Sequence, residues 1–584
     1  METKGIILVG MTIMCCLWAC GSCESSDVYI DPGVDSSGDG SIEAPYKYWA
    51  DVAFESGHAY VQKRDTIAYE SIKVGQSGTP SERIVLGAYG SGADPIIYGA
   101  ESETNWVDAG VAGKKVYQKA ISLAVGEGLG NVSEDGNLLA FVAWNTDAAT
   151  TFVSATAGAY TYDYRTQTVY IWSSDGADPD AHTIEVSKKL FGVHGEGISY
   201  ITVRDLHIKR ASLHGILFKN SSHITVKNCT IEDLGGAVVI VSPTIYAGNG
   251  IEFGNACSDC IVESCTVRNC FDSGISPQTY ANDMNTSGFV FRDSRVERCG
   301  FAGIEIAVLS VGMNCSITDV LVSNNVISDC GAGWSGIRYG DGGRGIKVAA
   351  DAGSGTIRGV QMEQNTISNC MGSGIYLYGD IGQISIHRSS LHDNKLDGIE
   401  ALDDANPSSL ALALSSSLIY NNGSNNGAND RFGVSHNIPY GAGMQLYHNT
   451  FHDNGSINVA IWNTGGVVTA KNNVYHTSGT TTHFYSNVDL PGADIDNNCY
   501  YEHGGAIIHV NGSAGSPYAT VKAFKDNTTF AENGIGTANP GLDIDFTLMA
   551  GSRCIGNGAT GTGIAEDHAG KTFSVPPSIG AYEY

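Results

Sequence analysis

The chain has 584 residues, of which 74 are Gly and only 14 Pro, and 42% are apolar, so it can bury a large core and shows no collagen-like bias. Its formal net charge of −28 argues against nucleic-acid binding, because such a surface repels phosphate backbones. The chain is long for one compact domain, but an elongated repeat fold escapes this limit because each unit packs only on its neighbours.

The first residues are typical of an export signal, with the charge of Lys4, an apolar stretch over 5–18 and small residues after it. Leu17-Trp18-Ala19-Cys20 resembles a bacterial lipoprotein processing box, although a small residue is usual at the position of Trp18. Removal of residues 1–19 would make Cys20 the lipidated first residue, and ordinary signal cleavage is the alternative. We expect an exported protein, either a lipoprotein of the outer surface or periplasm that touches the membrane through its lipid alone, or a secreted one.

Residues 27–195 are expected to form an N-terminal cap and opening coils. Strand-like runs at 83–88 and 168–172 alternate with turns rich in Gly and Asp. A small β-rich insertion is predicted near residues 105–185.

A parallel β-helix with a closing C-terminal segment is expected over residues 196–584. A motif of Gly, a β-branched residue, an outward position and an apolar residue recurs at intervals of 24 to 42 residues, which predicts a solenoid. Its copies begin at Gly215, Gly250, Gly274, Gly303, Gly345, Gly374 and Gly398, and weaker copies begin at Gly433 and Asn458.

Two further columns repeat in the same segment. Polar residues stand two positions before an aliphatic or aromatic anchor, at Cys229, Cys265, Ser294, Asn325, Asn365, Ser389, Ser416, Asn449 and Asn473. Coils stacked about 4.8 Å apart would align these side chains into a hydrogen-bonded ladder. The residues three past the anchor are Cys270, Cys299, Cys330, Cys370, Asn394, Asn421 and Asn454.

The cysteines of the second column are interpreted as small stacking residues. No His or second Cys accompanies each of them at ligand spacing, which disfavours a metal cluster. Cys257 and Cys260 form a C-x2-C pair without a matching second pair, so a local disulfide or no bond is favoured over zinc.

The chain resembles bacterial right-handed parallel β-helix proteins of the pectin-lyase-like superfamily, of the carbohydrate-active type. The resemblance rests on the repeats and on short segments near both ends: 29–33, 38–41, 45–46, 88–90, 97–99 and 579–582. It implies an all-β right-handed parallel β-helix. The superfamily includes polysaccharide lyases, glycoside hydrolases, epimerases and non-catalytic adhesins, so the resemblance does not fix an activity.

One strand face of the solenoid is predicted to form a polar groove. Strands have a period of two, so the position after each β-branched residue faces solvent. These outward residues are Leu217, Lys219, Glu252, Ser276, Gln278, Glu305, Lys347, Tyr376, Tyr378, Glu400, Leu402, Ser435, Asn437, Ala460 and Trp462.

Insertions near 235–249, 331–344 and 422–432 are expected to form walls beside this groove. They would bring several long side chains close to it: Tyr246, Trp334, Arg338, Tyr339, Asp341, Arg344 and Arg431. Sugars suit such a surface because their C–H faces stack on aromatic rings while polar groups bind hydroxyls. A merely solvated polar face is the alternative.

Glycoside hydrolysis requires two carboxylates about 5 to 5.5 Å apart for retention or about 6.5 to 9.5 Å apart for inversion. Glu252 and Glu305 are predicted two coils apart, about 9.6 Å along the axis. Glu400 with Asp403 or Asp404 is the other candidate pair, although the two aspartates could equally cap a turn.

β-Elimination instead requires a base beside a uronate carboxylate and positive charge to stabilise the intermediate. Lys347 is predicted one coil from both Glu305 and Tyr376, with Arg338 and Arg344 in the preceding loop. An ion pair with Glu305 would hold Lys347 protonated and spoil it as a base. A C5-epimerase would use similar chemistry, and a non-catalytic glycan-binding or surface protein could use the same face.

We favour an exported polysaccharide-processing enzyme, with glycoside hydrolysis first because carboxylates outnumber basic residues on the predicted face. Glu305 and Glu400 are the leading acid/base candidates, followed by Lys347 and Glu252. The predicted substrate-binding residues are Tyr376, Tyr378, Gln278, Arg338, Arg344, Asp403, Asp404 and Trp462. The expected partner is a polysaccharide or oligosaccharide. No cofactor is required; calcium stays an open alternative, but no spacing matches a calcium loop.

Overall fold

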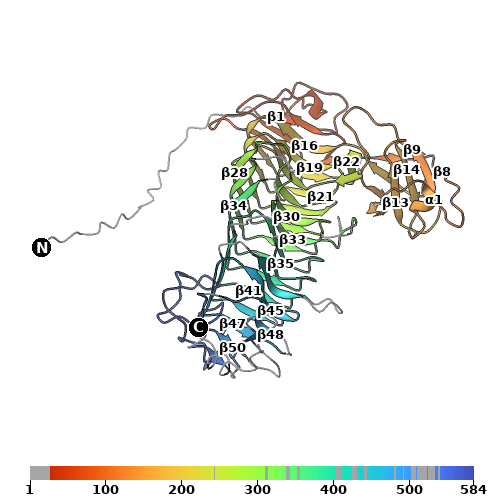
Figure 1. Ribbon diagram of the computed structural model, residues 1–584. Coiled ribbons are helices and arrows are strands. Elements are labelled where there is room, and N and C mark those ends of the chain that lie inside the picture. The colour runs from red at the N-terminus through yellow and green to blue at the C-terminus, as the bar shows by residue number, and fades with distance from the viewer. Residues whose placement is uncertain are drawn as a thin grey trace.

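The computed structural model describes residues 27–241, 244–309, 314–336, 342–350, 355–402, 410–423, 431–439, 443–478, 482–490, 492–501, 508–509, 523, 526, 533–536 and 539–584. Over these residues the chain forms a parallel β-helix in which each coil contributes one strand to each of three long sheets. The axis runs from the N-terminal cap to the C-terminal coils (Figure 1). We call the sheets A, B and C in the order in which the chain visits them.

Sheet A has 14 strands. They are β1 (Val28–Ile30), β2 (Ala59–Lys63), β5 (Ile84–Tyr89), β17 (Ser199–Arg204), β20 (Ser222–Lys227), β25 (Ile261–Glu263), β28 (Asn285–Arg292), β31 (Ser316–Ser323), β34 (Thr356–Glu363), β37 (Gln383–His387), β40 (Ala411–Ser415), β43 (Gly443–Tyr447), β46 (Val467–Lys471) and β49 (Asp494–Asp496).

Sheet B also has 14 strands. They are β3 (Ile67–Ala68), β6 (Ile96–Tyr98), β18 (His207–Lys209), β21 (Thr230–Leu234), β26 (Thr266–Cys270), β29 (Arg295–Glu297), β32 (Val326–Ser328), β35 (Thr366–Ser368), β38 (Ser390–His392), β41 (Leu418–Tyr420), β44 (Thr450–His452), β47 (Val474–His476), β50 (Cys499–Tyr500) and β52 (Ile535–Gly536).

Sheet C has 13 strands. They are β4 (Ile72–Val74), β16 (Phe191–Glu196), β19 (His214–Lys219), β24 (Ile251–Gly254), β27 (Ile275–Thr279), β30 (Ala302–Val308), β33 (Arg344–Ala350), β36 (Ile375–Gly379), β39 (Ile399–Leu402), β42 (Phe432–Ile438), β45 (Ile457–Thr464), β48 (Thr482–Ser486) and β51 (Ile508–His509).

The core is built from aligned columns of β-branched side chains. Ile251, Ile275, Ile304 and their equivalents in neighbouring coils are fully buried, and each pairs in register with the next coil. The glycine before each isoleucine marks a close approach between coils. A Cβ at Gly250 would lie 2.5 Å from the carbonyl oxygen of Gly274 and 2.4 Å from a methyl carbon of Val267. This contact explains why the motif begins with glycine.

The predicted ladders are present, with one local correction. Asn449 donates from its amide nitrogen to Asn473 Oδ1 at 3.0 Å, and Asn473 donates in the same way to Asn498 at 2.9 Å. In the coil of β41, however, the ladder members are Ser417 and Asn422, and the predicted Ser416 and Asn421 are wrong by one residue. The anchor of this coil is Ile419, whose pairing with Leu391 fixes the register, and not the adjacent Leu418.

The stacked cysteines have a structural role. Cys270, Cys299, Cys330 and Cys370 are fully buried thiols without disulfides, and burial raises the pKa of Cys270. Cys257 and Cys260 are also free. Within the described part of the chain, no cysteine belongs to a group with metal-ligand geometry.

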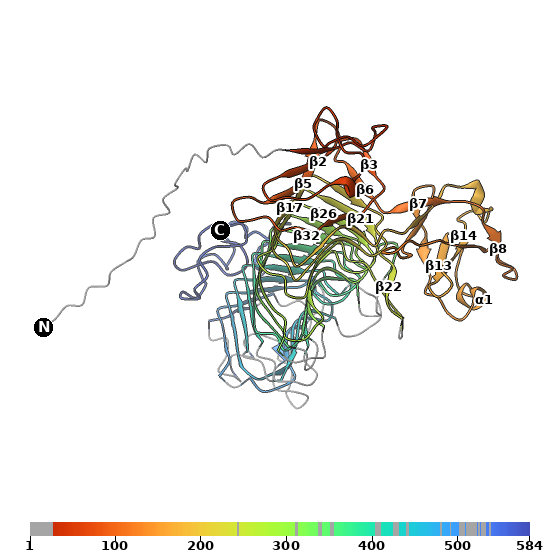
Figure 2. The ribbon, with the colours of Figure 1, turned by 90° about the horizontal axis from the view of Figure 1, so that it is seen from above.

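A side domain interrupts the turn between β6 of sheet B and β16 of sheet C. One of its sheets contains β11 (Asn137–Leu138), β10 (Val132–Glu134), β15 (Ile184–Ser187) and β7 (Ala100–Glu103). The other contains β12 (Ala140–Phe141), β13 (Ala159–Asp163), β14 (Thr168–Trp172), β9 (Tyr117–Ala120) and β8 (Val107–Asp108). The only described α-helix, α1 (Ala148–Thr151), belongs to this domain, and short 3-10 turns occur at Trp49–Asp51 and Pro179–Ala181. The domain projects sideways from the N-terminal part of the solenoid (Figure 2).

Aromatic residues fix the side domain to the solenoid. A hairpin of β22 (Ala237–Val241) and β23 (Thr244–Ala247) brings Tyr246 against Tyr162, and Trp334 packs on Phe271 and Tyr160. The Trp334 indole nitrogen donates to the carbonyl of Asn269 at 2.8 Å. Two aromatic residues expected to approach the polar face are therefore used to dock a domain.

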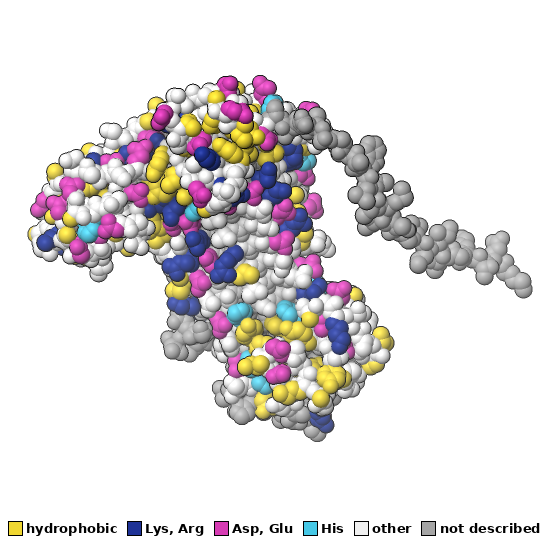
Figure 3. Space-filling view, turned by 180° about the vertical axis from the view of Figure 1, so that it is seen from behind, with side chains coloured by type: hydrophobic (Ala, Val, Ile, Leu, Met, Phe, Trp, Pro, Cys, Tyr) yellow, Lys and Arg dark blue, Asp and Glu magenta, His cyan; other side chains and the backbone are white. Residues whose placement is uncertain are grey.

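The C-terminal tail, residues 539–584, runs back along the outside of several coils. Glu566 forms an ion pair of 3.1 Å with Arg388, and the amide of Ala581 donates to Thr450 Oγ1 at 3.1 Å. No helix among the described residues is long and apolar enough to cross a membrane. In the rear view, acidic side chains are scattered over the side domain and the cap, and several Lys and Arg side chains lie on the part of the solenoid below the side domain (Figure 3).

The corrected register can be tested with Asn422→Ala. Asn422 accepts from Asn394 and donates to Asn454 and to the carbonyl of Leu391, so its loss leaves buried polar groups without partners. We expect the free energy of unfolding to fall by about 2–4 kcal/mol in chemical denaturation. The matched control is Asn421→Gly, since Asn421 is exposed at φ 54 and should cost less than about 1 kcal/mol. Equal losses in the two variants would contradict the register.

Candidate functional site

The outer surface of sheet C carries two aligned columns of mostly polar side chains. The central column follows each isoleucine and contains Leu217, Glu252, Ser276, Glu305, Lys347, Tyr376, Glu400 and Ser435. The flanking column lies three residues earlier in each coil and contains His214, Asn249, Ser273, Ala302, Arg344, Ser373, Asp397 and Phe432. We call these two columns and the residues that contact them the sheet C face.

Most polar side chains of this face are withdrawn from water. Glu252 is 4% exposed, Glu305 2%, Lys347 9% and Tyr376 8%. A merely solvated strand face would leave such groups open, so the solvated alternative does not describe this surface. Burial of polar groups costs free energy unless each one finds partners.

The three glutamates of the central column share one contact. Each faces the flanking residue of the preceding coil: His214 Nε2 is 3.3 Å from Glu252, Ser273 Oγ donates to Glu305 at 2.8 Å, and Ser373 Oγ donates to Glu400 at 2.6 Å. The remaining partners differ, and they give each glutamate a different chemistry.

Glu252 is held by neutral donors. Asn249 donates from its amide nitrogen at 2.9 Å, and the hydroxyl of Tyr280 also bonds to the carboxylate. The backbone amide of Asn249 donates to His214 Nδ1, which leaves the imidazole proton on Nε2, toward Glu252. Burial lowers the pKa of His214. Burial and the charge of Glu252 raise the pKa of Tyr280, so its phenol remains protonated.

Glu305 forms the ion pair expected with Lys347, at 3.1 Å. Gln278 donates to the same carboxylate at 2.8 Å, and the Lys347 ammonium lies 4.3 Å from the ring centre of Phe301. Charge neutralisation and hydrogen bonds together account for the near-complete burial of Glu305.

Arg344 and two tyrosines form a stack in the next coils. The guanidinium carbon of Arg344 lies 3.5 Å from the ring centre of Tyr376, within cation–π range. Tyr376 and Tyr378 stack at 6.1 Å with an interplanar angle of 11°. Planar groups are thereby presented directly beside the coil of Glu400.

Asp397 and Glu400 form a carboxyl pair that the sequence analysis missed. Burial raises the pKa of Asp397 well above its usual value, and the negative charge of Glu400 raises it further, while the amide of Phe432 at 3.0 Å and the charge of Arg431 partly offset the rise. Two acids in contrasting environments are the usual arrangement for proton transfer. Asp397 stands directly before the motif glycine Gly398, at a position that belongs to the outer face of sheet C. An acid at this position is the sequence signal for the pair.

The repeat shows what Asp397 replaces. Asn249-Gly250-Ile251-Glu252 and Asp397-Gly398-Ile399-Glu400 occupy equivalent positions in their coils. In each coil, Oδ1 of the first of these residues accepts a hydrogen bond from the backbone amide of the flanking residue in the next coil. Where Asn249 donates to Glu252, Asp397 places a carboxyl group with a raised pKa beside Glu400, so an acid occupies the place of an amide donor.

Register fixes the spacing of the predicted catalytic residues. Glu252 and Glu305 are two coils apart, as expected. Glu305 and Glu400 are three coils apart, about 14 Å along the axis. This exceeds the separation of a carboxyl pair that shares one glycosidic bond, so each would need its own partner. The catalytic assignments of Glu305, Glu400, Lys347 and Glu252 stay predictions.

The remaining predicted site residues are distributed as follows. Gln278, Arg344, Tyr376 and Tyr378 belong to the sheet C face, and Trp462 lies toward its C-terminal end, between Phe432 at 5.8 Å and Tyr485 at 5.2 Å. Arg338, Asp403, Asp404 and Cys20 lie outside the described residues, as do Tyr339 and Asp341. Hollows of about 400 and 200 Å³ lie against the C-terminal tail, away from this face.

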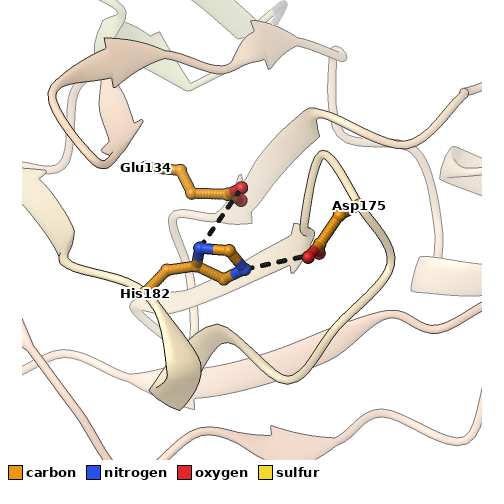
Figure 4. Close-up of side chains that lie close together, drawn as sticks. All are labelled: Glu134, Asp175 and His182. Atoms are coloured by element: carbon orange, nitrogen blue, oxygen red, sulfur yellow. Dashed lines mark hydrogen bonds and ion pairs between the residues drawn. The ribbon is translucent and has the colours of Figure 1, made fainter.

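One His-carboxylate cluster in the side domain has the composition of a metal site. Glu134, Asp175 and His182 lie close together (Figure 4). However, His182 Nδ1 is 2.8 Å from Asp135 and Nε2 is 3.3 Å from Asp175, so both ring nitrogens face carboxylates. The hydrogen bond to Asp135 raises the pKa of His182. The cluster therefore favours a bridging imidazolium over a metal-bound imidazole, which must be neutral.

Comparisons with known proteins agree on the fold. The family model described as right handed beta helix region matches residues 160–277 and 191–386. The solved structure of XylC with xylose is similar at 13% identity and a TM-score of 0.53, covering 95% of this chain and 98% of that chain. Together these confirm the predicted right-handed parallel β-helix.

Two further solved structures are similar at lower scores. GH136 lacto-N-biosidase from Eubacterium ramulus is 14% identical, with 88% and 68% of the two chains covered and a TM-score of 0.40. Pectate lyase Pel9A is 15% identical, with 95% and 96% covered and a TM-score of 0.39. A sequence search of curated proteins finds no match.

The carboxyl pair predicts a pH-dependent stability difference. Below its usual pKa of 3.8, Asp397 is protonated in both folded and unfolded protein and costs nothing. As the pH rises toward the higher folded-state pKa, the unfolded state loses its proton first and stability falls. We therefore expect Asp397→Asn to become more stable relative to wild type as the pH is raised from about 4 to 7, measured by urea unfolding.

The control for this measurement is Glu43→Gln, an exposed residue of the N-terminal cap, which should follow the wild-type pH profile. A stability difference between Asp397→Asn and wild type that does not change with pH would contradict the raised pKa of Asp397.

Proposed function

We propose that this protein is a carbohydrate-processing enzyme that binds an extended glycan along the sheet C face and hydrolyses it at Asp397 and Glu400. The observation that carries the proposal is the contrast within this pair. Asp397 is buried with a raised pKa, beside a second carboxyl group on the same polar face. The structural likeness to XylC, whose structure contains xylose, supports a sugar as the ligand.

The pair can divide the chemistry of hydrolysis. Asp397, whose raised pKa favours the protonated form, donates its proton to the glycosidic oxygen as the bond breaks. The Glu400 carboxylate, oriented by Ser373 at 2.6 Å, then accepts a proton from the attacking water or bonds to the anomeric carbon itself. The half-buried Tyr378, stacked on Tyr376, offers ring surface to sugar C–H groups next to this position.

β-Elimination or C5-epimerisation of a uronate is the second candidate. Arg344 and Lys347 place two cations two coils from Glu400, where they could neutralise a substrate carboxylate. The ion pair with Glu305 leaves Lys347 poorly suited as the base. Glycan binding without cleavage is the third candidate and would use the same residues.

The activity assay uses xylan, mannan, cellulose, polygalacturonate and alginate, followed for new reducing ends and for ultraviolet absorbance of an unsaturated product. We expect reducing ends without that absorbance. Asp397→Asn and Glu400→Gln should each lower the rate about 100- to 10,000-fold, because each removes one proton-transfer group. Glu363→Gln is the isosteric control and should retain the wild-type rate. The presence of both signals would favour a lyase. The absence of both signals would favour a binding protein.

Glu305→Gln separates the two carboxylate assignments. Its removal from the buried pair with Lys347 should lower stability. If this variant retains full activity under conditions where it is folded, Glu305 is not catalytic. If the folded variant loses activity as Glu400→Gln does, Glu305 also contributes to the reaction, three coils from Glu400.

We also propose export, with Cys20 as a lipidated N-terminus. The support is the charged and apolar stretch over residues 4–18 and the processing-box resemblance that ends at Cys20. Metabolic labelling with a palmitate analogue should mark the wild-type chain in a bacterial host. Equal labelling of Cys20→Ser would remove the lipoprotein assignment.

A further inference from the structure

The N-terminal part of the sheet C face contains a second carboxylate cluster, built differently from the Asp397–Glu400 pair. Tyr280 follows β27 and folds back over Gly254 of the preceding coil. A Cβ at position 254 would lie 2.5 Å from the Tyr280 hydroxyl and 3.3 Å from Glu252 Oε1. The absence of a side chain there lets the phenol reach Glu252.

The cluster is suited to binding rather than to proton transfer. His214 is buried and neutral, Tyr280 keeps its proton, and the other donor to Glu252 is the amide of Asn249. Among the described residues, no Lys or Arg forms an ion pair with Glu252, in contrast to Glu305. A buried carboxylate held only by neutral donors is a strong acceptor, and here it fixes the hydroxyl of Tyr280 and thereby the position of the exposed ring.

The exposed part of the cluster fits a sugar. Tyr280 is 37% exposed, and the Lys219 ammonium lies 5.2 Å from its ring centre. Glu252 and Glu196 both act on Tyr280 with negative charge. With one lysine against two carboxylates, the local charge is negative and favours a neutral sugar over a uronate.

The distance to the reaction centre can be counted in coils. From β24 to β39 the register passes through β27, β30, β33 and β36, which is five steps. At about 4.8 Å per step, Glu252 and Glu400 are about 24 Å apart along the axis. A pyranose unit in an extended chain advances by about the same length as one coil, so about five units separate the two clusters.

We propose that Glu252, Tyr280 and Lys219 form a distal subsite that binds a neutral monosaccharide unit about five units from the bond cleaved at Asp397 and Glu400. This inference rests on the proposed function for the position of the bond. It assigns the protein to long, extended chains, since a short oligosaccharide cannot occupy both clusters.

The test compares short and long oligosaccharides from xylan, mannan and cellulose, with the matching polygalacturonate series as the charged arm. For the wild type we expect kcat/KM for hexasaccharides and longer chains to exceed that for trisaccharides. Tyr280→Ala should reduce this ratio about tenfold, the effect of losing about 1.4 kcal/mol of binding to the distal unit. Tyr280→Phe keeps the ring and loses the hydroxyl, so its kcat/KM ratio should lie between those of the wild type and Tyr280→Ala. The control is Val326→Ala, on the outer surface of sheet B, which should keep the wild-type ratio.

Binding to the same oligosaccharides by calorimetry distinguishes the failure of each proposal. Cleavage with a ratio unchanged by Tyr280→Ala would overturn the subsite and leave the function standing. Length-dependent binding that Tyr280→Ala abolishes, without cleavage of any chain, would support the subsite and overturn hydrolysis. A wild-type protein that neither binds nor cleaves these chains would overturn both. A preference of the distal unit for galacturonate would overturn its assignment as a neutral-sugar subsite.

Discussion

The in-register stacking of one coil on the next is the constraint on which the whole structure depends. Parallel strands pair residue for residue, so each chemical choice in one coil is repeated or answered at the same height in its neighbours. Inside, this produces columns of isoleucine and ladders of asparagine whose amides bond along the axis. A polar residue can be buried there because its partner is supplied by the adjacent coil.

The same stacking organises the sheet C face. A side chain in the flanking column reaches the central residue of its own coil, as Asn249 does, or that of the next coil, as Ser273 does. Three glutamates at equivalent positions thereby acquire three different surroundings: neutral donors at Glu252, a cation at Glu305 and a second acid at Glu400. The fold holds the geometry constant while single substitutions change the chemistry.

Much of the architecture could be predicted because periodicity is visible in the sequence. The Gly-Ile motif located the strands of sheet C, and the ion pair between Glu305 and Lys347 followed from their adjacency. The error at Ser416 and Asn421 has a simple cause: Leu418 and Ile419 are both apolar, and sequence spacing alone does not show which one points inward. Register with the neighbouring coil decides it.

What could not be predicted depends on contacts between coils and between domains. The raised pKa of Asp397 arises from burial and from Glu400, and nothing in the local sequence distinguishes it from an exposed turn aspartate. Tyr246 and Trp334 are aromatic residues in long insertions, a pattern that suits a sugar-binding wall equally well as a domain contact. Only the side domain packed against them decides between these roles.

The polar face also has an energetic implication. Replacing a buried ion pair by apolar residues is often neutral or stabilising, so stability alone does not explain the retention of Glu305 and Lys347. Stability explains a buried carboxylate with neutral donors at Glu252, or a buried acid with a raised pKa at Asp397, even less. In the interior of the solenoid the same coils use isoleucine and asparagine, which meet the requirements of stacking at lower cost. The buried ionisable groups of the two columns lie on the outer surface of sheet C, and the proposed glycan binding and proton transfer at that surface would account for their cost.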